Sequence, residues 1–387
     1  MIRSLIILSG LLLIGGCSMF KGDDSEAVDP PAPLPEYESQ LKLDRLWSIK
    51  VGGSSENLLL GLTPGTDGAR VYAAAHGGKA LALDLETGKP VWATATGYEF
   101  SAGPAVGHGL AVFGTSDGEV VALDTLKGEV LWISQVEGEV LSAPAISATS
   151  VAVRTVDGRL RVLETADGTE RWNVQQPVPK LSLRGTSVPA ISGETVVAGF
   201  DNGRVAAYTL RDGQTRWENV IAPARGRTEV ERLSDVDSPI NIVDQDIYAA
   251  SYNGRTASLA LESGQILWSQ EVPSYHGLAA DWTAVFVTSS VSHVVSMSRT
   301  SGAILWTQEA LHQRGLTAPV PVGDALVVGD FEGYIHWLDV RNGELIGRAR
   351  IDSTAIIAAP KVAGDAVIVL TEAGTMAAYR ARPPKSD

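Results

Sequence analysis

The chain has 387 residues, 44% of them apolar, which is enough to bury one large core or two ordinary ones. Its 45 acidic residues outnumber its 31 basic residues, and the formal net charge is −14 at pH 7. Because such a surface repels phosphate backbones and anionic lipids, the composition argues against nucleic-acid partners.

Residues 1–16 are predicted to be a lipoprotein signal peptide. Arg3 provides its positive charge, and the apolar run at 5–14 is too short to span a bilayer. The run ends in Ile-Gly-Gly-Cys at 14–17, a pattern in which small residues precede a lipidated cysteine. Removing residues 1–16, which carry Arg3 and no acid, changes the net charge from −14 to −15.

Cys17 is the only cysteine, so no disulfide can form within the chain. Ser18, rather than aspartate, follows it, which in lipoproteins of this kind implies delivery to the outer membrane. We therefore expect lipid anchoring through Cys17 on the periplasmic face of the outer membrane. The alternative is an ordinary signal peptide followed by an incidental cysteine.

Residues 17–40 are predicted to form a lipidated flexible tether. Five acidic residues and four prolines lie between positions 23 and 36, a composition that cannot bury a core.

The remainder, residues 41–387, repeats one pattern that we call the frame. A glycine is followed ten residues later by a second glycine and fourteen residues later by a tryptophan. Frames begin at Gly78, Gly118, Gly158, Gly203, Gly254, Ser292 and Gly333, and a truncated eighth copy begins at Gly374. In the seventh frame Gly347 replaces the tryptophan. Successive starts lie 38 to 51 residues apart, which indicates a solenoid or a propeller.

Each repeat predicts four antiparallel strands joined by tight turns, which we call strands A, B, C and D. In one repeat, 110–113 predicts strand B, 118–124 predicts strand C, and Trp132 lies on strand D. A single four-stranded sheet cannot cover both of its faces, so neighbouring sheets must stack. The predicted fold is all-β, an eight-bladed β-propeller in which the frame tryptophans pack between blades.

The ring is predicted to close through its N-terminal strand. The eighth copy ends at Pro383-Pro384, and two prolines cannot continue into a regular strand D. Residues 41–47, which end in Trp47, resemble a strand D that lacks the preceding glycine. We therefore expect this segment to complete the last blade.

Two consecutive connections between blades contain extra residues. Relative to a usual 26 residues between frames, about five are added after Trp172 and eleven after Trp217. Both precede a strand A in consecutive blades, so the two loops should be neighbours on one face.

The first long loop contains Leu181, Leu183 and Arg184, and the second contains Asp235 and Asp237. Apolar anchors beside an arginine are typical of protein interfaces, so these five residues are predicted to bind a partner. A self-packed loop with an internal Arg184–Asp pair is the alternative.

The residues give no sign of catalytic chemistry. The six histidines lack metal-ligand spacing, and the glycines lie in predicted hairpins rather than in a phosphate-binding loop. We predict no catalytic, cofactor-binding or metal-binding residues.

The Ala-Leu-Asp-x-x-x-Gly-x-x-x-Trp pattern resembles the quinoprotein-type propeller repeat. With the lipoprotein signal, Leu-Ser-Leu-Arg-Gly at 181–185 and Leu-Ser-Asp-Val-Asp at 233–237, the chain resembles the BamB family of outer-membrane protein assembly lipoproteins. That resemblance implies a non-enzymatic scaffold subunit of the β-barrel assembly (BAM) machinery. It implies docking on the periplasmic POTRA domains of the barrel insertase BamA through Leu181, Leu183, Arg184, Asp235 and Asp237.

The resemblance also implies indirect association with other BAM lipoproteins, no cofactor, and membrane contact through the lipid anchor alone. Whether the ring also binds unfolded outer-membrane proteins stays open. Two other functions remain as alternatives. A quinone-cofactor (PQQ-type) dehydrogenase uses the same repeat, and a periplasmic glycan-binding propeller would need an aromatic platform, for which Trp282 and Trp337 are the tryptophans outside the frame.

Overall fold

A computed structural model describes residues 29–52 and 60–384 of the chain. The predicted signal peptide, Cys17 and the first part of the predicted tether lie outside the described residues. The chain divides into two units, residues 1–30 and 31–387, and every described strand belongs to the second unit. Asp29 and Pro30, the described residues of the first unit, have no regular secondary structure. Among the described residues, no helix is long and apolar enough to cross a bilayer.

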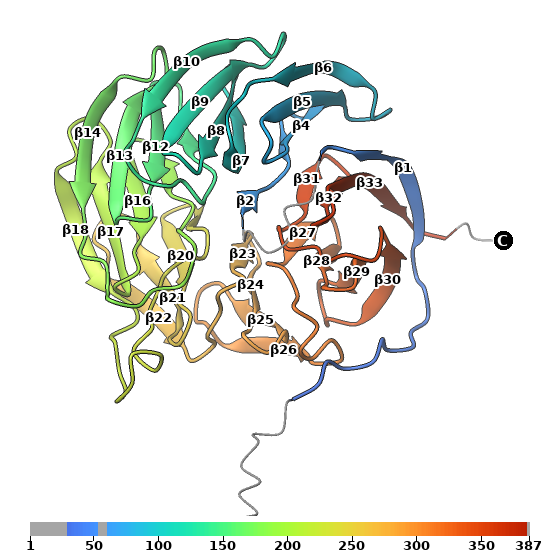
Figure 1. The fold of residues 1–387 in the computed structure, drawn as a ribbon. Coiled ribbons are helices and arrows are strands. Elements are labelled where there is room, and N and C mark those ends of the chain that lie inside the picture. The colour runs from blue at the N-terminus through green and yellow to red at the C-terminus, as the bar shows by residue number, and fades with distance from the viewer. Residues whose placement is uncertain (1–28, 53–59, 385–387) are drawn as a thin grey trace, which may run out of the picture. The chain divides into compact units, whose positions relative to one another are not determined.

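The described part of the second unit forms eight sheets arranged in a ring, which confirms the predicted eight-bladed propeller (Figure 1). Blades 1 to 4 contain β3 (Gly65–Thr66), β4 (Arg70–Ala74), β5 (Lys79–Asp84) and β6 (Pro90–Ala95); β7 (Phe100–Gly107), β8 (Leu110–Thr115), β9 (Glu119–Asp124) and β10 (Val130–Gln135); β11 (Ala145–Ile146), β12 (Ser150–Arg154), β13 (Arg159–Glu164) and β14 (Glu170–Gln175); and β15 (Ala190–Ser192), β16 (Thr195–Gly199), β17 (Arg204–Thr209) and β18 (Thr215–Val220).

Blades 5 to 8 contain β19 (Asn241–Val243), β20 (Asp246–Ala250), β21 (Thr256–Ala260) and β22 (Ile266–Gln270); β23 (Leu278–Ala280), β24 (Ala284–Thr288), β25 (Val294–Ser298) and β26 (Ile304–Gln308); β27 (Val320–Val322), β28 (Ala325–Gly329), β29 (Tyr334–Asp339) and β30 (Leu345–Arg350); and β31 (Lys361–Ala363), β32 (Ala366–Leu370), β33 (Thr375–Arg382) and β1 (Lys42–Lys50). The two-residue strand β2 (Gly61–Leu62) adds a parallel fifth strand to blade 2, beside β7.

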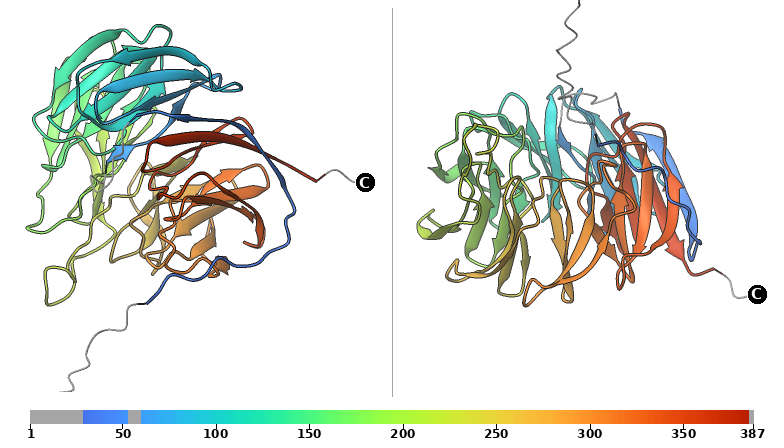
Figure 2. Two further views of the ribbon diagram at one scale, coloured as in Figure 1. Left: turned by 45° about the vertical axis from the view of Figure 1, so that its right-hand side comes forward. Right: turned by 90° about the horizontal axis from the view of Figure 1, so that it is seen from below.

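Burial along each blade follows from its place in the ring. Strand B is buried on both faces, as in β12 and β16, because neighbouring blades cover it. Strand D lies at the outer edge and is largely exposed, as in β10. Figure 2 shows the blades side by side from further directions, with strands that run between loops on the two faces.

The frame tryptophans join seven of the eight blades to the next blade, as predicted. Seven indole Nε1 atoms donate hydrogen bonds of 2.7 to 3.1 Å to a backbone carbonyl of the following blade; the donors are Trp47, Trp92, Trp132, Trp172, Trp217, Trp268 and Trp306. Each ring also covers the hairpin glycine of the following blade. At Gly213 the backbone has φ of 73°, and a Cβ atom there would lie 2.7 Å from Cδ2 of Trp172. Glycine is therefore needed for the turn and for the ring that covers it.

The N-terminal strand closes the ring, as predicted. β1 pairs antiparallel with β33 from Lys42 opposite Arg382 to Lys50 opposite Thr375 (Figure 1). A register shift just before Trp47 matches the shift between Val130 and Trp132 in blade 2, so β1 has the bulge of an ordinary strand D.

Blade 7 keeps an indole ring, although Gly347 replaces its frame tryptophan. In blade 2 the small Ala122 on strand C lies opposite Trp132 on strand D, whereas in blade 7 Trp337 on strand C lies opposite Gly347 on strand D. The bulky and small residues have exchanged strands. Trp337 still faces blade 8, where its ring lies 6.2 Å from that of Tyr379.

The last part of the predicted tether lies along blades 6 and 7. The amide of Ala32 donates to the carbonyl of His312, and Arg348 Nη1 donates to the carbonyl of Pro35 over 3.1 Å. Gln40 donates its backbone N–H to the carbonyl of Ile346. β30 is consequently buried at positions that are exposed in β26.

We predict that deleting residues 41–47 strongly lowers the melting temperature, because blade 8 loses part of its outer strand and the Trp47 contact with blade 1. Loss of a buried tryptophan alone costs about 3–5 kcal/mol. Thermal unfolding followed by circular dichroism would measure the change. A variant that lacks residues 18–28 is the control, and equal melting temperatures for the two deletions would contradict N-terminal closure.

Candidate functional site

The two long loops meet, as predicted from their place in consecutive blades. The first spans 176–189 between β14 and β15, and the second spans 221–240 between β18 and β19. The backbone N–H of Leu183 donates a 2.9 Å hydrogen bond to Oδ1 of Asp235. A Cβ atom on Gly185 would lie 3.2 Å from Oδ2 of Asp237, so glycine permits the second close approach. All five predicted partner-binding residues therefore come together at one place.

Buried residues on both sides of Asp235 fix the second loop to the ring. Leu233 and Val236 are buried. Val236 packs closely against Gly199, because a Cβ atom built on Gly199 would lie only 2.6 Å from Cγ1 of Val236. Because these anchors hold Asp235 in place, Asp235 in turn holds the backbone of the first loop.

Arg184 extends over a third connection. Its Nη1 and Nη2 atoms donate to Oε2 and Oε1 of Glu139 over 3.0 and 2.7 Å, a bidentate ion pair. Glu139 lies between β10 and β11, in the connection from blade 2 to blade 3. The pair is partly exposed, with 46% of the Arg184 side chain accessible, so it adds at most about 1 kcal/mol. Nothing in the sequence pointed to Glu139, because it lies in a connection of ordinary length.

The two loops present apolar side chains to solvent. On the first loop, Leu181 is 41% exposed, and Val178, three residues earlier, is also exposed. On the second loop, Val230 is 59% exposed. Leu183 is half-buried. We call Leu181, Leu183 and Arg184 the loop surface. Val178 and Val230 extend the apolar area of these loops and were not predicted.

The two aspartates differ from the loop surface because they point into the protein. Asp235 is 1% exposed, and Oδ2 of Asp235 and Oδ1 of Asp237 are buried without a hydrogen-bond partner. Asp201, between β16 and β17, joins them, and carboxylate oxygens of the three residues lie within 4.8 Å of one another. We call Asp201, Asp235 and Asp237 the carboxyl cluster.

One buried cation faces the carboxyl cluster. Arg154 ends β12 and places Nη2 3.4 Å from Oδ1 of Asp201, and both side chains are almost fully buried. The guanidinium also lies 4.3 Å from the centre of the Phe200 ring. The described residues contain no other group of three acids or histidines close enough to share a metal ion. We assign no metal to this group, because Arg154 already provides positive charge at Asp201.

The cluster has more acids than its single arginine can neutralise. Burial raises the pKa of Asp235 to about 6, although the hydrogen bond from Leu183 lowers it. Burial also raises the pKa of Asp237 well above its ordinary value, and the charges of Asp201 and Asp235 add to this. Neither Arg154 nor Asp201 was singled out from the sequence, because nothing in the sequence shows that they meet.

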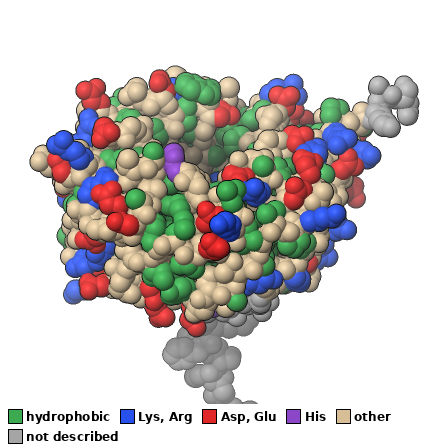
Figure 3. Space-filling model, turned by 90° about the horizontal axis from the view of Figure 1, so that it is seen from above, with side chains coloured by type: hydrophobic (Ala, Val, Ile, Leu, Met, Phe, Trp, Pro, Cys, Tyr) green, Lys and Arg blue, Asp and Glu red, His purple; other side chains and the backbone are tan. Residues whose placement is uncertain are grey.

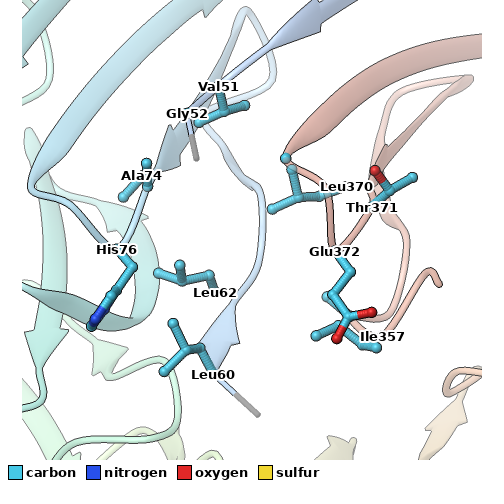
Figure 4. A pocket seen from close by; sticks show the side chains of 13 residues that line it. Val51, Gly52, Leu60, Leu62, Ala74, His76, Ile357, Leu370, Thr371 and Glu372 are labelled. Carbon is cyan, nitrogen blue, oxygen red and sulfur yellow. The ribbon is translucent and has the colours of Figure 1, made fainter. Parts of the chain in front are cut away.

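Two hollows formed by the described residues lack the polar groups of an active site or are too small for a substrate. The hollow in Figure 4 lies between blades 1 and 8, with His76 on one wall and Glu372 on the other. Its volume is about 20 Å³, room for about one water molecule. A larger hollow of about 400 Å³ is formed at the first strands of several blades, and prolines and aliphatic residues line it, with Lys361 as the one charged residue of the lining. That lining contains no carboxylate that could hold a metal ion.

The aromatic platform that a glycan-binding propeller would need is incomplete. Trp282 is 74% exposed, with the Arg299 guanidinium 5.2 Å from its ring, but Trp337 is fully buried. Acidic, basic and apolar side chains are interspersed on the side of the molecule seen in Figure 3, without a large patch of one charge.

Comparison with known proteins identifies the family. A family model described as "Outer membrane protein assembly factor BamB" matches residues 92–308 and 290–383. Proteins of that name from Pseudomonas aeruginosa and Yersinia pestis are 41% and 35% identical to the chain, and each alignment covers 97% of this chain and 98% of the relative.

Solved structures agree with this comparison. BamB from Moraxella catarrhalis superimposes with a TM-score of 0.79 at 27% identity, over 88% of this chain and all of that one. A quinohemoprotein alcohol dehydrogenase from Comamonas testosteroni has a TM-score of 0.69 at 14% identity, over 89% of this chain and 78% of that one, which shows a shared fold alone. The chain belongs to the BamB family of outer membrane protein assembly factors.

Proposed function

We propose that this protein is a non-enzymatic scaffold of the β-barrel assembly machinery, lipid-anchored on the periplasmic face of the outer membrane. It docks on the POTRA domains of BamA through the loop surface and so assists the assembly of outer-membrane proteins. The name shared by its relatives supports the assembly role. The observation that carries the docking role is the coupling of the two long loops, which leaves Leu181 and Arg184 exposed on a fixed backbone.

The five predicted residues have two different tasks in this proposal. Leu181, Leu183 and Arg184 contact the partner, because two of them are exposed and Leu183 is partly accessible. An apolar anchor beside a planar guanidinium is the composition of an interface hot spot. Asp235 is too enclosed for that contact, and Oδ1 of Asp237 is buried, so these two residues act by positioning the first loop.

We predict that Arg184→Glu abolishes most capture of purified BamA POTRA domains. The substitution removes the guanidinium and places a second carboxylate beside Glu139. Truncating one partner of a charged contact at an interface costs about 2–5 kcal/mol, which corresponds to at least a tenfold loss of affinity. Surface plasmon resonance would measure the dissociation constant.

Arg211→Glu is a matched control for this experiment. It makes the same charge change at an exposed residue of the turn between β17 and β18, where Arg211 pairs only weakly with Asp212. Equal affinities for Arg184→Glu and Arg211→Glu, with unchanged melting temperatures, would refute the docking assignment.

We predict that Asp237→Asn stabilises the protein at neutral pH, by about 1.4 kcal/mol for each unit by which folding raises the pKa of Asp237. The pKa of Asp237 is raised on folding, so the native state retains a proton that the unfolded chain loses above a pKa of about 3.9. This carboxyl is therefore increasingly destabilising as the pH rises from 4. Asparagine does not titrate, so the stability of Asp237→Asn relative to the wild type should increase as the pH rises.

Urea denaturation at pH 4.5 and pH 7.5 would test this linkage. Asp117→Asn, at an exposed turn residue, is the control for the loss of one negative charge. If Asp237→Asn is less stable than the wild type at pH 7.5, the carboxyl cluster does not carry the excess charge that we assign to it.

A further inference from the structure

The residues that precede β1 follow the ring instead of leaving it, and we call residues 31–40 the strap. Arg348 Nη1 donates a 3.1 Å hydrogen bond to the carbonyl of Pro35, and the backbone N–H of Gln40 donates to the carbonyl of Ile346. Because later residues of the strap meet earlier residues of β30, the strap runs antiparallel along the outer edge of blade 7. In Figure 1 this segment, drawn in blue, passes outside β30 and leads into β1.

Arg314 holds the first part of the strap. It lies in the connection between β26 and β27, and only 3% of its side chain is exposed. Nε and Nη2 donate to Oδ2 of the fully buried Asp330 over 2.9 and 2.7 Å, and Nη1 donates to the carbonyl of Ala32 over 3.0 Å. The N–H of Ala32 donates in turn to the carbonyl of His312. Because Asp330 fixes the guanidinium, Arg314 presents Nη1 to the strap in a set direction.

Tyr37 fixes the middle of the strap. It packs against the apolar cluster that blades 6 and 7 share, which includes Phe286 and Leu326. The Arg348 guanidinium lies 5.0 Å from the centre of the Tyr37 ring. A proline-rich segment of ten residues is therefore held at both ends and in the middle.

The two ends of the strap lie on opposite faces of the ring. Ala32 lies against the connection between β26 and β27, which leads from a strand D to a strand A. The loop surface belongs to a connection of the same kind, so both are on one face. The other end of the strap leads to Lys42, which pairs with Arg382 at the end of a strand C, and strands C end at the opposite face.

This path changes where the predicted lipid tether begins and how far it can reach. Ala32 is 15 positions after Cys17, and Leu41 is 24 positions after it. A fully extended chain would span about 50 Å from Cys17 to Ala32, and about 80 Å from Cys17 to Leu41 if the strap were released. Release would also move the origin of the tether to the face opposite the loop surface.

We propose that the strap fixes the origin of the lipid tether on the face of the ring that carries the loop surface. This inference rests on the lipid anchor and the docking role proposed for this protein. An anchor that leaves from the docking face, with the shorter reach, keeps the loop surface close to the outer membrane, where the proposed partner lies. Confining the ring and its partner to one layer raises their effective concentration for each other.

Energy transfer to a membrane dye tests the proposal in the absence of BamA. The chain from Cys17 onward is coupled through its only cysteine to a maleimide lipid in phosphatidylcholine vesicles that contain acceptor-labelled lipids. A donor dye is attached through an azide-bearing amino acid at Ser353, in the connection after β30, or at Asn342, in the hairpin before β30, and both residues are exposed. The six residues of β30 separate the two positions by about 20 Å. We expect stronger transfer from position 353, whose mean distance from the membrane should be shorter by up to about 20 Å.

Two variants release the strap, one from each side. Ala32→Pro/Tyr37→Ser removes the N–H that binds the ring and the aromatic side chain beneath Arg348. Arg348→Ser removes the contacts with Pro35 and Tyr37 from the side of the ring. In both variants transfer from position 353 should fall and transfer from position 342 should rise, so that the difference is lost or reversed.

Pro33→Ser/Glu38→Ser is the matched control, because it changes two exposed residues of the strap. It should behave as the wild type does. Equal transfer from the two positions in the wild type, or an unchanged difference in both release variants, would overturn the proposal. The lipid is attached chemically and no partner is present, so this result is independent of lipidation in cells and of POTRA capture. Undiminished capture by Arg184→Glu would count against the docking role alone.

Discussion

An indole ring that donates its N–H to a backbone carbonyl of the next blade is the contact on which this ring depends. It occurs at seven of the eight junctions, always with a hairpin glycine beneath the ring. Because each blade is a sheet of four strands with two apolar faces, it is stable only between two neighbours. The contact joins seven pairs of neighbouring blades, and the eighth junction, between blades 7 and 8, closes without it. The junction between blades 8 and 1 is made by β1, which brings Trp47 from the N-terminal end of the chain to blade 1.

A fixed ring makes the connections between blades the variable part of the molecule. The two long loops at 176–189 and 221–240 belong to consecutive blades, so Asp235 on one can accept a hydrogen bond from the backbone of the other. Arg184 then reaches Glu139 on the connection before them. Three connections are thus linked by side chains on one face. A partner that contacts this face meets a surface whose backbone is already ordered, which lowers the entropic cost of binding.

The sequence predicted the blade number, the closure by β1 and the packing of the frame tryptophans, because all three follow from a strict local spacing. It also predicted that the two long loops are neighbours. It did not predict that Asp235 and Asp237 are enclosed, because their burial depends on Arg154 and Asp201 from two other blades. Nor did it predict that blade 7 has its tryptophan, Trp337, on strand C opposite the small Gly347 on strand D. The glycine–tryptophan spacing does not show which residues of neighbouring strands lie opposite each other. The proline-rich composition around residues 31–40 predicted a tether, and it did not reveal the hydrogen bonds that Ala32 and Pro35 make with blades 6 and 7.

The central claim is that the partner contacts the loop surface and not the exposed outer strands, which also carry apolar side chains. A photoreactive amino acid placed at Leu181 or at Leu305 in living cells would decide between them, because both side chains are well exposed and Leu305 lies on the outer strand β26. The account predicts a strong crosslink to BamA from position 181 and none from position 305. A crosslink to BamA from position 305 with none from position 181 would contradict it.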